Sequence, residues 1–286
     1  MKINPNKFIL GTANLCTKYG IKSTLINESK SKELLNFAYK KNIKILDLST
    51  DYKFYEKIKK NKNIKNWKMS FKVTNKDIKK LKNESDINKF IFYLLKVSNK
   101  KKIEYLLFHN PKDLLSEKGS KIFNLFLKIK KKNKIGKIGA SVYTKNDIIK
   151  LLNKFDLDLI QGPFNIFDQR LKDFRIQKLF RKNKIEFHAR SIFLQGIAAD
   201  KTLLTKKIKN LNEIKNWFKY LSDNKKSAIT ETLNLINQNS FIKKIIIGAR
   251  SRKQLKQILS TKIENDKKNY SNFKSKNLKL IDPRKW

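Results

Sequence analysis

The stretch INKFIFYLLKVSNKKKIEYLLFH (87–109) contains two different hydrophobic periodicities in direct succession. Apolar residues recur with helical spacing over 87–100, whereas IEYLLFH (103–109) is a short apolar run of the strand type. A helix that leads at once into a strand is the repeating unit of parallel α/β sheets. This stretch therefore predicts a fold in which strands and helices alternate.

The same alternation extends along the whole chain. Seven further runs have strand character: 7–13, 43–49, 68–74, 135–142, 157–163, 185–191 and 243–249. Helical periodicity recurs between them, for example over 31–42, 119–133 and 252–260. Consecutive parallel strands require right-handed helical crossovers, and eight such units in 286 residues fit a (β/α)8 TIM barrel better than an open doubly wound sheet.

No repeat, Pro/Gly-rich linker or break in composition divides the chain, so we expect a single domain over residues 1–286. The connection after the seventh strand is longer than the others. We expect a helical and loop insertion at about 196–240, with helices near 208–222 and 225–238. The tail, SNFKSKNLKLIDPRKW (271–286), has no obvious chemistry.

The formal net charge of +44 raises the question of a polyanionic partner. The basic residues are 61 Lys and only 7 Arg, however, and they are spread along the chain. Nucleic-acid readers favour clustered arginines, so compositional drift toward Lys, Asn and Ile explains the charge better than a nucleic-acid partner. The rarer Arg and His residues then become informative, and we single out Arg170, Arg190, Arg250, Arg252, His109 and His188.

Cys16 is the only cysteine, which excludes an internal disulfide and a cysteine-based metal cluster, and no metal site is expected. The N-terminus MKINPNKFIL is not a signal peptide, and no apolar run is long enough to span a bilayer. These features predict a cytoplasmic protein without a membrane partner.

Four titratable residues follow or end three successive predicted strands. Asp47 ends the second strand and Tyr52 follows it, Lys72 ends the third, and His109 comes directly after the fourth. Because the carboxyl ends of the strands form the mouth of a TIM barrel, we expect these side chains to meet there. Each also has an ordinary structural explanation, such as a turn residue, a loop aromatic or one lysine among many.

Together these groups could protonate a carbonyl oxygen. A tyrosine with a free pKa of about 10 becomes a usable acid when a nearby ammonium stabilises its phenolate. In this interpretation Lys72 supplies the ammonium, Asp47 holds it in place and His109 orients the substrate oxygen. Protonation of that oxygen suits hydride delivery to the attached carbon, which requires a cofactor.

In the order of these motifs the chain resembles the aldo-keto reductases, which are NAD(P)H-dependent barrel enzymes. The resemblance rests on LGTANLCTKYGI (10–21), LDLSTDY (46–52), FKVT (71–74), LLFHNP (106–111), GKIGASVYT (136–144), DLIQGPFNIFDQR (158–170), RSIFLQG (190–196) and IIIGARSRKQL (245–255). It implies that Asp47, Tyr52, Lys72 and His109 are the catalytic tetrad, with Tyr52 as the proton donor.

The resemblance also implies a cofactor site. Ser141 and Gln161 match residues that hold the nicotinamide carboxamide, and Arg190 and Ser191 match residues beside the nicotinamide. Gly248, Ala249, Arg250 and Gln254 fall in the segment around the adenosine phosphate. Because a guanidinium forks onto phosphate, Arg250 favours NADPH, with NADH as the alternative.

Four positions depart from the family pattern: Lys53 follows Tyr52 in place of glycine, Val142 replaces an asparagine, Arg190 replaces an aromatic residue and Ile258 replaces an adenine-contacting asparagine. The variant motifs GASVYT (139–144) and RSIFLQG (190–196) resemble a divergent bacterial branch of the family and suggest a sugar-derived carbonyl. We therefore expect an NADPH-dependent reductase of a small-molecule aldehyde or ketone. The alternative is a basic barrel that has lost catalysis and binds nucleic acid or another anionic polymer. The sequence does not determine the oligomeric state.

Overall fold

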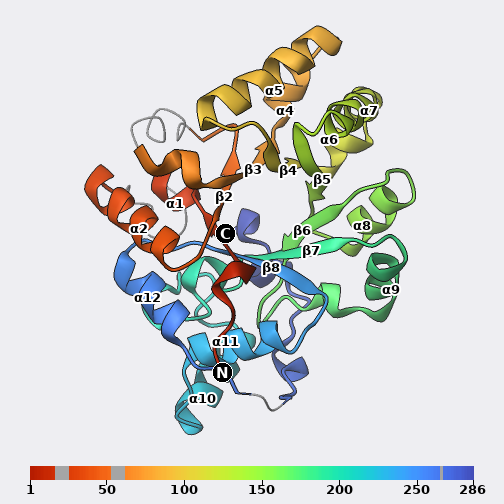
Figure 1. Cartoon of the computed structure of the whole chain (residues 1–286). Helices are drawn as coiled ribbons and strands as arrows, with labels where there is room; N and C mark the ends of the chain where they lie inside the picture. Colours follow the sequence, from red (N-terminus) through yellow and green to blue (C-terminus); the bar gives the residue numbers. More distant parts are fainter. Residues whose placement is uncertain (17–25, 53–61, 265–266) are drawn as a thin grey trace.

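The computed structural model contains eight parallel strands that close into a barrel in chain order, with the last strand paired to the first (Figure 1). The structure describes residues 1–16, 26–52, 62–264 and 267–286. The strands are β1 (Phe8–Gly11), β2 (Ile45–Ser49), β3 (Lys68–Val73), β4 (Ile103–Phe108), β5 (Ile135–Ser141), β6 (Leu159–Pro163), β7 (Glu186–Arg190) and β8 (Ile242–Ile247). The predicted (β/α)8 TIM barrel is confirmed, because each predicted strand run overlaps one of these strands.

Helices surround this barrel (Figure 1). They are α1 (Ala13–Cys16), α2 (Glu28–Lys40), α4 (Asn75–Lys80), α5 (Glu84–Ser98), α6 (Pro111–Leu115), α7 (Glu117–Lys131), α8 (Lys145–Leu152), α9 (Phe174–Lys182), α10 (Asn212–Asp223), α11 (Ala228–Asn237), α12 (Arg252–Ser260) and α13 (Leu278–Ile281). None of the described helices is long and apolar enough to cross a membrane.

The helix α5 and the strand β4 illustrate how local sequence produces the repeating unit. The side chain of Asn83 caps the start of α5 by accepting a hydrogen bond from the Asp86 backbone amide, 2.9 Å away. Asn99 ends the helix in the left-handed conformation, with a φ of 52°. The buried face of α5 includes Ile87 and Ile91, so its apolar stripe covers the barrel.

Alternation along the strands gives the barrel interior an apolar layer with polar layers above and below it. The apolar layer is a cluster separate from the main core and consists of Ile9, Ile45, Tyr105, Leu107, Leu159 and Ile246. Two residues further toward the carboxyl end, Asp47 and Gln161 share the inward face with Ile45 and Leu159. The interior therefore becomes polar toward the mouth.

Between β7 and β8 the chain passes through η4 (Leu194–Gly196), η5 (Lys201–Leu203), α10 and α11. After α12 it continues through η6 (Ser271–Phe273), α13 and η7 (Pro283–Lys285). In η7, the Arg284 guanidinium lies 3.5 Å from the ring centroid of Tyr143, which follows β5. The C-terminal tail thus returns to the mouth of the barrel.

Candidate active site

The centre of the candidate site is a buried ion pair between Lys72 in β3 and Asp47 in β2. Each residue is only 5% exposed, and Lys72 Nζ donates a hydrogen bond to Asp47 Oδ2. The other carboxylate oxygen accepts from Ser70 Oγ at 3.3 Å and from Gln161 Nε2 at 3.1 Å. Because a buried charge is tolerated only when it is paired and hydrogen-bonded, Asp47 holds Lys72 in one position.

His109 lies directly after β4, and its backbone amide donates to Val73 O at 2.9 Å. Burial, together with the nearby positive charges of Lys72 and Arg190, lowers the pKa of its imidazole to about 4. The ring is therefore neutral at pH 7. A neutral imidazole can exchange a hydrogen bond with a carbonyl oxygen without adding charge to the mouth.

Tyr52 lies in the turn after β2, where its backbone amide donates to Ser49 O at 3.0 Å. Its ring is half-buried and packs against the main hydrophobic core. The turn therefore keeps Tyr52 at the same end of the barrel as the Asp47–Lys72 pair. Lys53, one of the predicted departures, lies outside the described residues.

The residues predicted to hold a nicotinamide carboxamide lie on adjacent strands. Ser141 in β5 pairs in register with Gln161 in β6, and both are buried. The Gln161 amide nitrogen is fixed by Asp47, which leaves its Oε1 as a buried acceptor without a partner among the described residues. An acceptor in this state fits the amino group of a carboxamide.

Arg190 ends β7 and extends toward the end of β5. Its Nη2 donates to Val142 O at 3.0 Å, its Nη1 donates to Ser191 Oγ at 3.4 Å, and its guanidinium lies 4.2 Å from the ring centroid of Tyr143. Ser191 has a φ of 56°, which turns the chain sharply after the strand. The guanidinium thus lies at the mouth beside the predicted carboxamide site.

The predicted adenosine-phosphate segment connects β8 to α12. The backbone amide of Arg250 donates to Gln254 Oε1 at 2.8 Å, and Ser251 caps the helix. A Cβ on Gly248 would meet Asn14 Nδ2 at 3.0 Å, so the backbone approaches the first βα connection closely there, while Ala249 is buried. A helix N-terminus flanked by an arginine suits a phosphate.

The predicted departure at Ile258 has a simple structural explanation, because this side chain is buried in the core beneath α12. Three participants were not anticipated from the sequence. Ser70 was detectable as the residue two positions before Lys72, on the same inward face. Tyr143 and Arg284 come into contact because the C-terminal tail folds back to the mouth. No local sequence pattern predicts where the tail packs.

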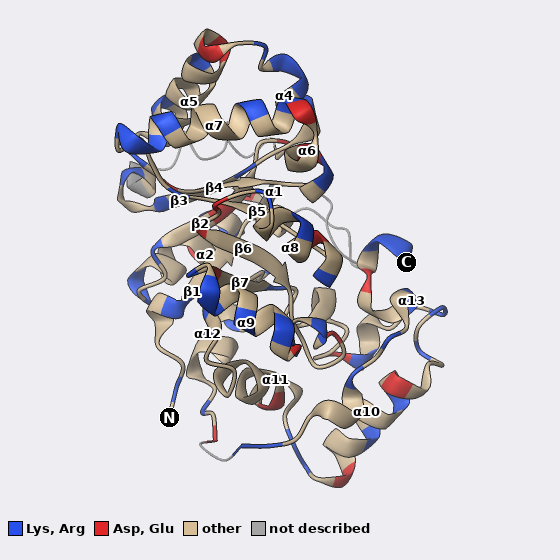
Figure 2. Ribbon diagram, turned by 90° about the vertical axis from the view of Figure 1, so that its right-hand side faces the viewer, with Lys and Arg blue, Asp and Glu red and all other residues tan. Residues whose placement is uncertain are grey.

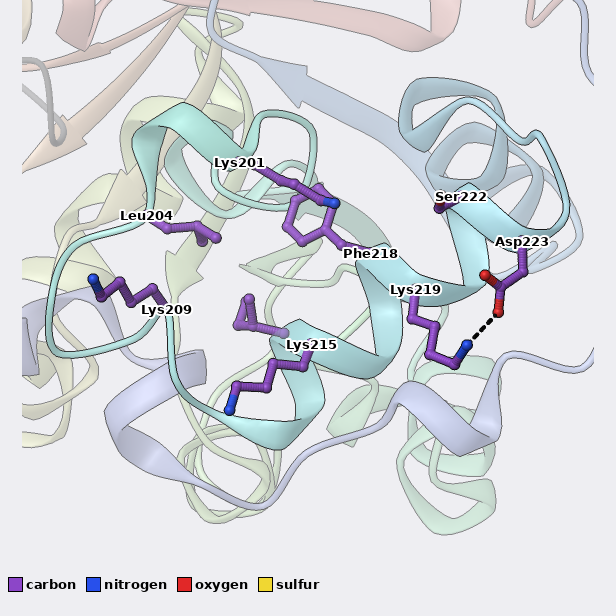
Figure 3. Close-up of a pocket in the computed structure, with 9 residues that line it drawn as sticks. Lys201, Leu204, Lys209, Lys215, Phe218, Lys219, Ser222 and Asp223 are labelled. Atoms are coloured by element: carbon purple, nitrogen blue, oxygen red, sulfur yellow. Dashed lines mark hydrogen bonds and ion pairs between the residues drawn. The ribbon is translucent and has the colours of Figure 1, made fainter.

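A hollow elsewhere on the surface, formed by η5 and α10, lacks such groups (Figure 3). Its lining includes Lys201 above the ring of Phe218, and Lys219 paired with Asp223 at 2.9 Å. Within the described residues, no cluster of three or more His, Cys, Asp or Glu could hold a metal ion. The mouth of the barrel therefore remains the candidate site.

Comparison with known proteins identifies the family. A model of the aldo/keto reductase family matches residues 7–277, which is nearly the entire chain. The chain belongs to the aldo/keto reductase family. This aldo-keto reductase is an NAD(P)H-dependent oxidoreductase that acts on small-molecule carbonyl compounds, as the family does. No curated protein sequence matches the chain.

Solved structures share the barrel of this aldo-keto reductase. The holo form of an aldo-keto reductase from Bacillus halodurans has a TM-score of 0.72 and 16% identity, with 91% of this chain and 88% of that chain covered. Glycerol dehydrogenase from Gluconobacter oxydans has a TM-score of 0.67 and 16% identity, with 97% and 92% covered. At such identities the likeness shows the fold alone.

Proposed function

We propose that this protein is an NADPH-dependent reductase of an aldehyde or ketone, with Tyr52 as the proton donor and a sugar-derived carbonyl as the substrate. The single observation that carries the proposal is the buried Lys72–Asp47 pair with Gln161 attached to it, at the end of the barrel where Tyr52 lies. Such an arrangement is suited to acid catalysis at neutral pH.

A nicotinamide cofactor held by Ser141 and Gln161 would supply hydride to the carbonyl carbon. The Tyr52 hydroxyl gives its proton to the carbonyl oxygen, and the Lys72 ammonium stabilises the phenolate that remains. Asp47 keeps Lys72 from turning away, and neutral His109 orients the oxygen. Ser141 and Gln161 hold the carboxamide, which fixes the face of the ring that meets the substrate.

The choice of NADPH rests on Arg250 at the start of α12, beside Ser251 and Gln254. A guanidinium with a helix N-terminus favours a 2′-phosphate over a free hydroxyl. The sugar-derived substrate is suggested by the branch of the family that the motifs resemble.

The test is substitution of Tyr52 by phenylalanine, which removes one hydroxyl. We expect kcat for NADPH oxidation against a panel of aldehydes, ketoses and keto-sugar nucleotides to fall by about 100-fold or more, with the NADPH Kd from fluorescence titration nearly unchanged. Tyr93→Phe on the outer face of α5 is the matched control, because Tyr93 is half exposed and far from the mouth in sequence and fold. Equal losses of cofactor binding and turnover would refute the role of Tyr52.

A further inference from the structure

Arg190 faces the interior of the barrel at its open end. Along β7, Glu186, His188 and Arg190 alternate with outward-facing residues, and His188 is fully buried with Nε2 2.9 Å from Glu186 Oε1. The edge of the His188 ring packs on Tyr105 of the interior cluster, with ring centroids 4.8 Å apart. Because side chains two positions apart share a face, Arg190 also points inward, one layer nearer to the mouth.

This guanidinium has no acidic partner among the described residues. Its two hydrogen bonds go to a backbone carbonyl and, at 3.4 Å, to a serine hydroxyl. The other two arginines nearby are each neutralised by a forked pair: Arg170 donates to Asp168 at 2.8 and 2.7 Å, and Arg284 donates to Asp282 at 2.8 and 2.6 Å. A guanidinium carries five N–H donors, so Arg190 has donors left over.

The other charges at the mouth are compensated. Lys72 is paired with Asp47, and Asp51 accepts from Thr74 Oγ1 at 3.3 Å and has Lys76 at 4.0 Å. His109 is neutral near pH 7. Among these groups at the mouth, Arg190 therefore carries a positive charge that no described carboxylate pairs with. It lies where a substrate would approach Lys72 and His109.

We propose that the substrate carries an anionic group, a carboxylate or a phosphate, which Arg190 binds while the carbonyl lies beside Lys72 and His109. A planar fork with spare donors matches either anion, and its partial burial strengthens the charge-assisted hydrogen bonds. The ring of Tyr143, which contacts the guanidiniums of both Arg190 and Arg284, lies next to this group. The inference rests on the proposed reductase function.

The test compares substrates that differ only in charge. Succinic semialdehyde is paired with butanal, and glyceraldehyde 3-phosphate with glyceraldehyde, so that the two pairs separate a carboxylate from a phosphate preference. We expect the wild type to have a kcat/KM at least 10-fold higher for the charged member of one pair. Arg190→Gln removes the charge and is expected to bring that ratio close to 1, whereas Arg190→Lys retains charge without the fork and should give an intermediate ratio.

Arg175→Gln is the matched control, because it removes one positive charge from an 89% exposed side chain on α9. It should leave the charged-to-neutral ratio as in the wild type. If Arg190→Gln does not fold, the same comparison is made with Arg190→Lys, for which the ratio must fall about fivefold.

Calorimetric titration with succinate and with inorganic phosphate measures anion binding without turnover. Binding to the wild type that is lost in Arg190→Gln supports the anion site even if no carbonyl is reduced, in which case the proposed function fails alone. Equal kcat/KM for both members of each pair in the wild type would overturn the inference and leave the reductase function standing. So would an Arg190→Gln variant that weakens NADPH binding and lowers both members of each pair equally, because Arg190 would then serve the cofactor.

Discussion

The pKa of the His109 imidazole is set by its burial and by its charged neighbours. Burial and the cations Lys72 and Arg190 act in the same direction, and they outweigh the opposite influence of Asp47 and Asp51. The neutral ring can therefore serve a substrate oxygen over the whole physiological pH range. A protonated ring would add a third cation to a mouth that already contains Lys72 and Arg190.

This environment predicts a pH dependence of stability. The pKa of His109 is about 4 in the folded protein and about 6.5 when unfolded, so the unfolded state binds the extra proton first as the pH falls. The free energy of unfolding should fall between pH 6.5 and pH 4, by about 2 kcal/mol after allowance for the partial exposure of the ring. Urea denaturation of wild type and His109→Asn at several pH values measures it.

Burial also lowers the pKa of His188, so His188 adds a loss of stability in the same direction as the pH falls, and the difference between wild type and variant is the informative quantity. Glu186, with a pKa lowered to about 2, loses its contribution only at lower pH. The variant should show a shallower pH dependence. Identical slopes for wild type and variant would contradict the assignment to His109.

Single residues also mark how far the sequence could predict the site. Asp47, Lys72 and His109 could be predicted to lie together because strand ends in a TIM barrel share one edge, and because histidine is rare in this chain. The contact of Arg284 with Tyr143 could not be predicted, because it depends on where a tail without secondary-structure signals folds back. The tail, in which we expected no obvious chemistry, packs against Tyr143 beside the candidate site.

At the scale of elements, the strands were predictable and the helix starts were less so. The runs of β-branched and aromatic residues mark all eight strands, whereas the predicted helices 31–42, 87–100 and 119–133 begin two or three residues too late. The true first turns are polar, and each is defined by a capping side chain, from Asn27, Asn83 and Ser116 respectively. Hydrophobic periodicity does not detect such turns, because they bury little apolar surface.

The ion pair at the mouth connects elements as well as residues, because Asp47 in β2 binds Lys72 in β3 and Gln161 across the barrel in β6. Asp47→Asn leaves a buried ammonium without its counter-charge, and we expect it to lower the free energy of unfolding by about 3 to 5 kcal/mol. Adding Lys72→Met to Asp47→Asn removes the ammonium that has lost its counter-charge. The double variant should therefore regain most of the stability while remaining inactive.

Chemical denaturation and NADPH oxidation assays on both single variants and the double variant distinguish the two contributions. Additive losses of stability in the double variant would mean that the two side chains do not act as a pair. Retained turnover in the double variant would remove Lys72 from the proposed mechanism.

On the scale of the whole molecule, lysines lie on nearly every outer helix and do not gather on one face (Figure 2). Three of the seven arginines, in contrast, lie around the mouth: Arg170, Arg190 and Arg284. This distribution agrees with a charge that arose by drift on the surface, while the arginines at the mouth have defined contacts. An anionic polymer would find no continuous stripe of arginines to bind.

A net charge of +44 spread over one barrel also predicts a response to salt. Several ion pairs join two exposed side chains, such as Lys121 with Glu117 and Lys219 with Asp223, and these contribute little. Repulsion among the many unpaired lysines acts over the whole surface and is screened at high ionic strength, when the Debye length falls to about 3 Å at 1 M salt. We therefore expect Tm to rise by about 3 °C between 20 mM and 500 mM sodium chloride.

Differential scanning calorimetry measures this shift in Tm. Sucrose at the same osmolality leaves the charges unscreened and gives the reference for non-ionic effects. A Tm that falls with salt would mean that the ion pairs outweigh the repulsion, and the surface lysines would then be part of what holds the barrel together.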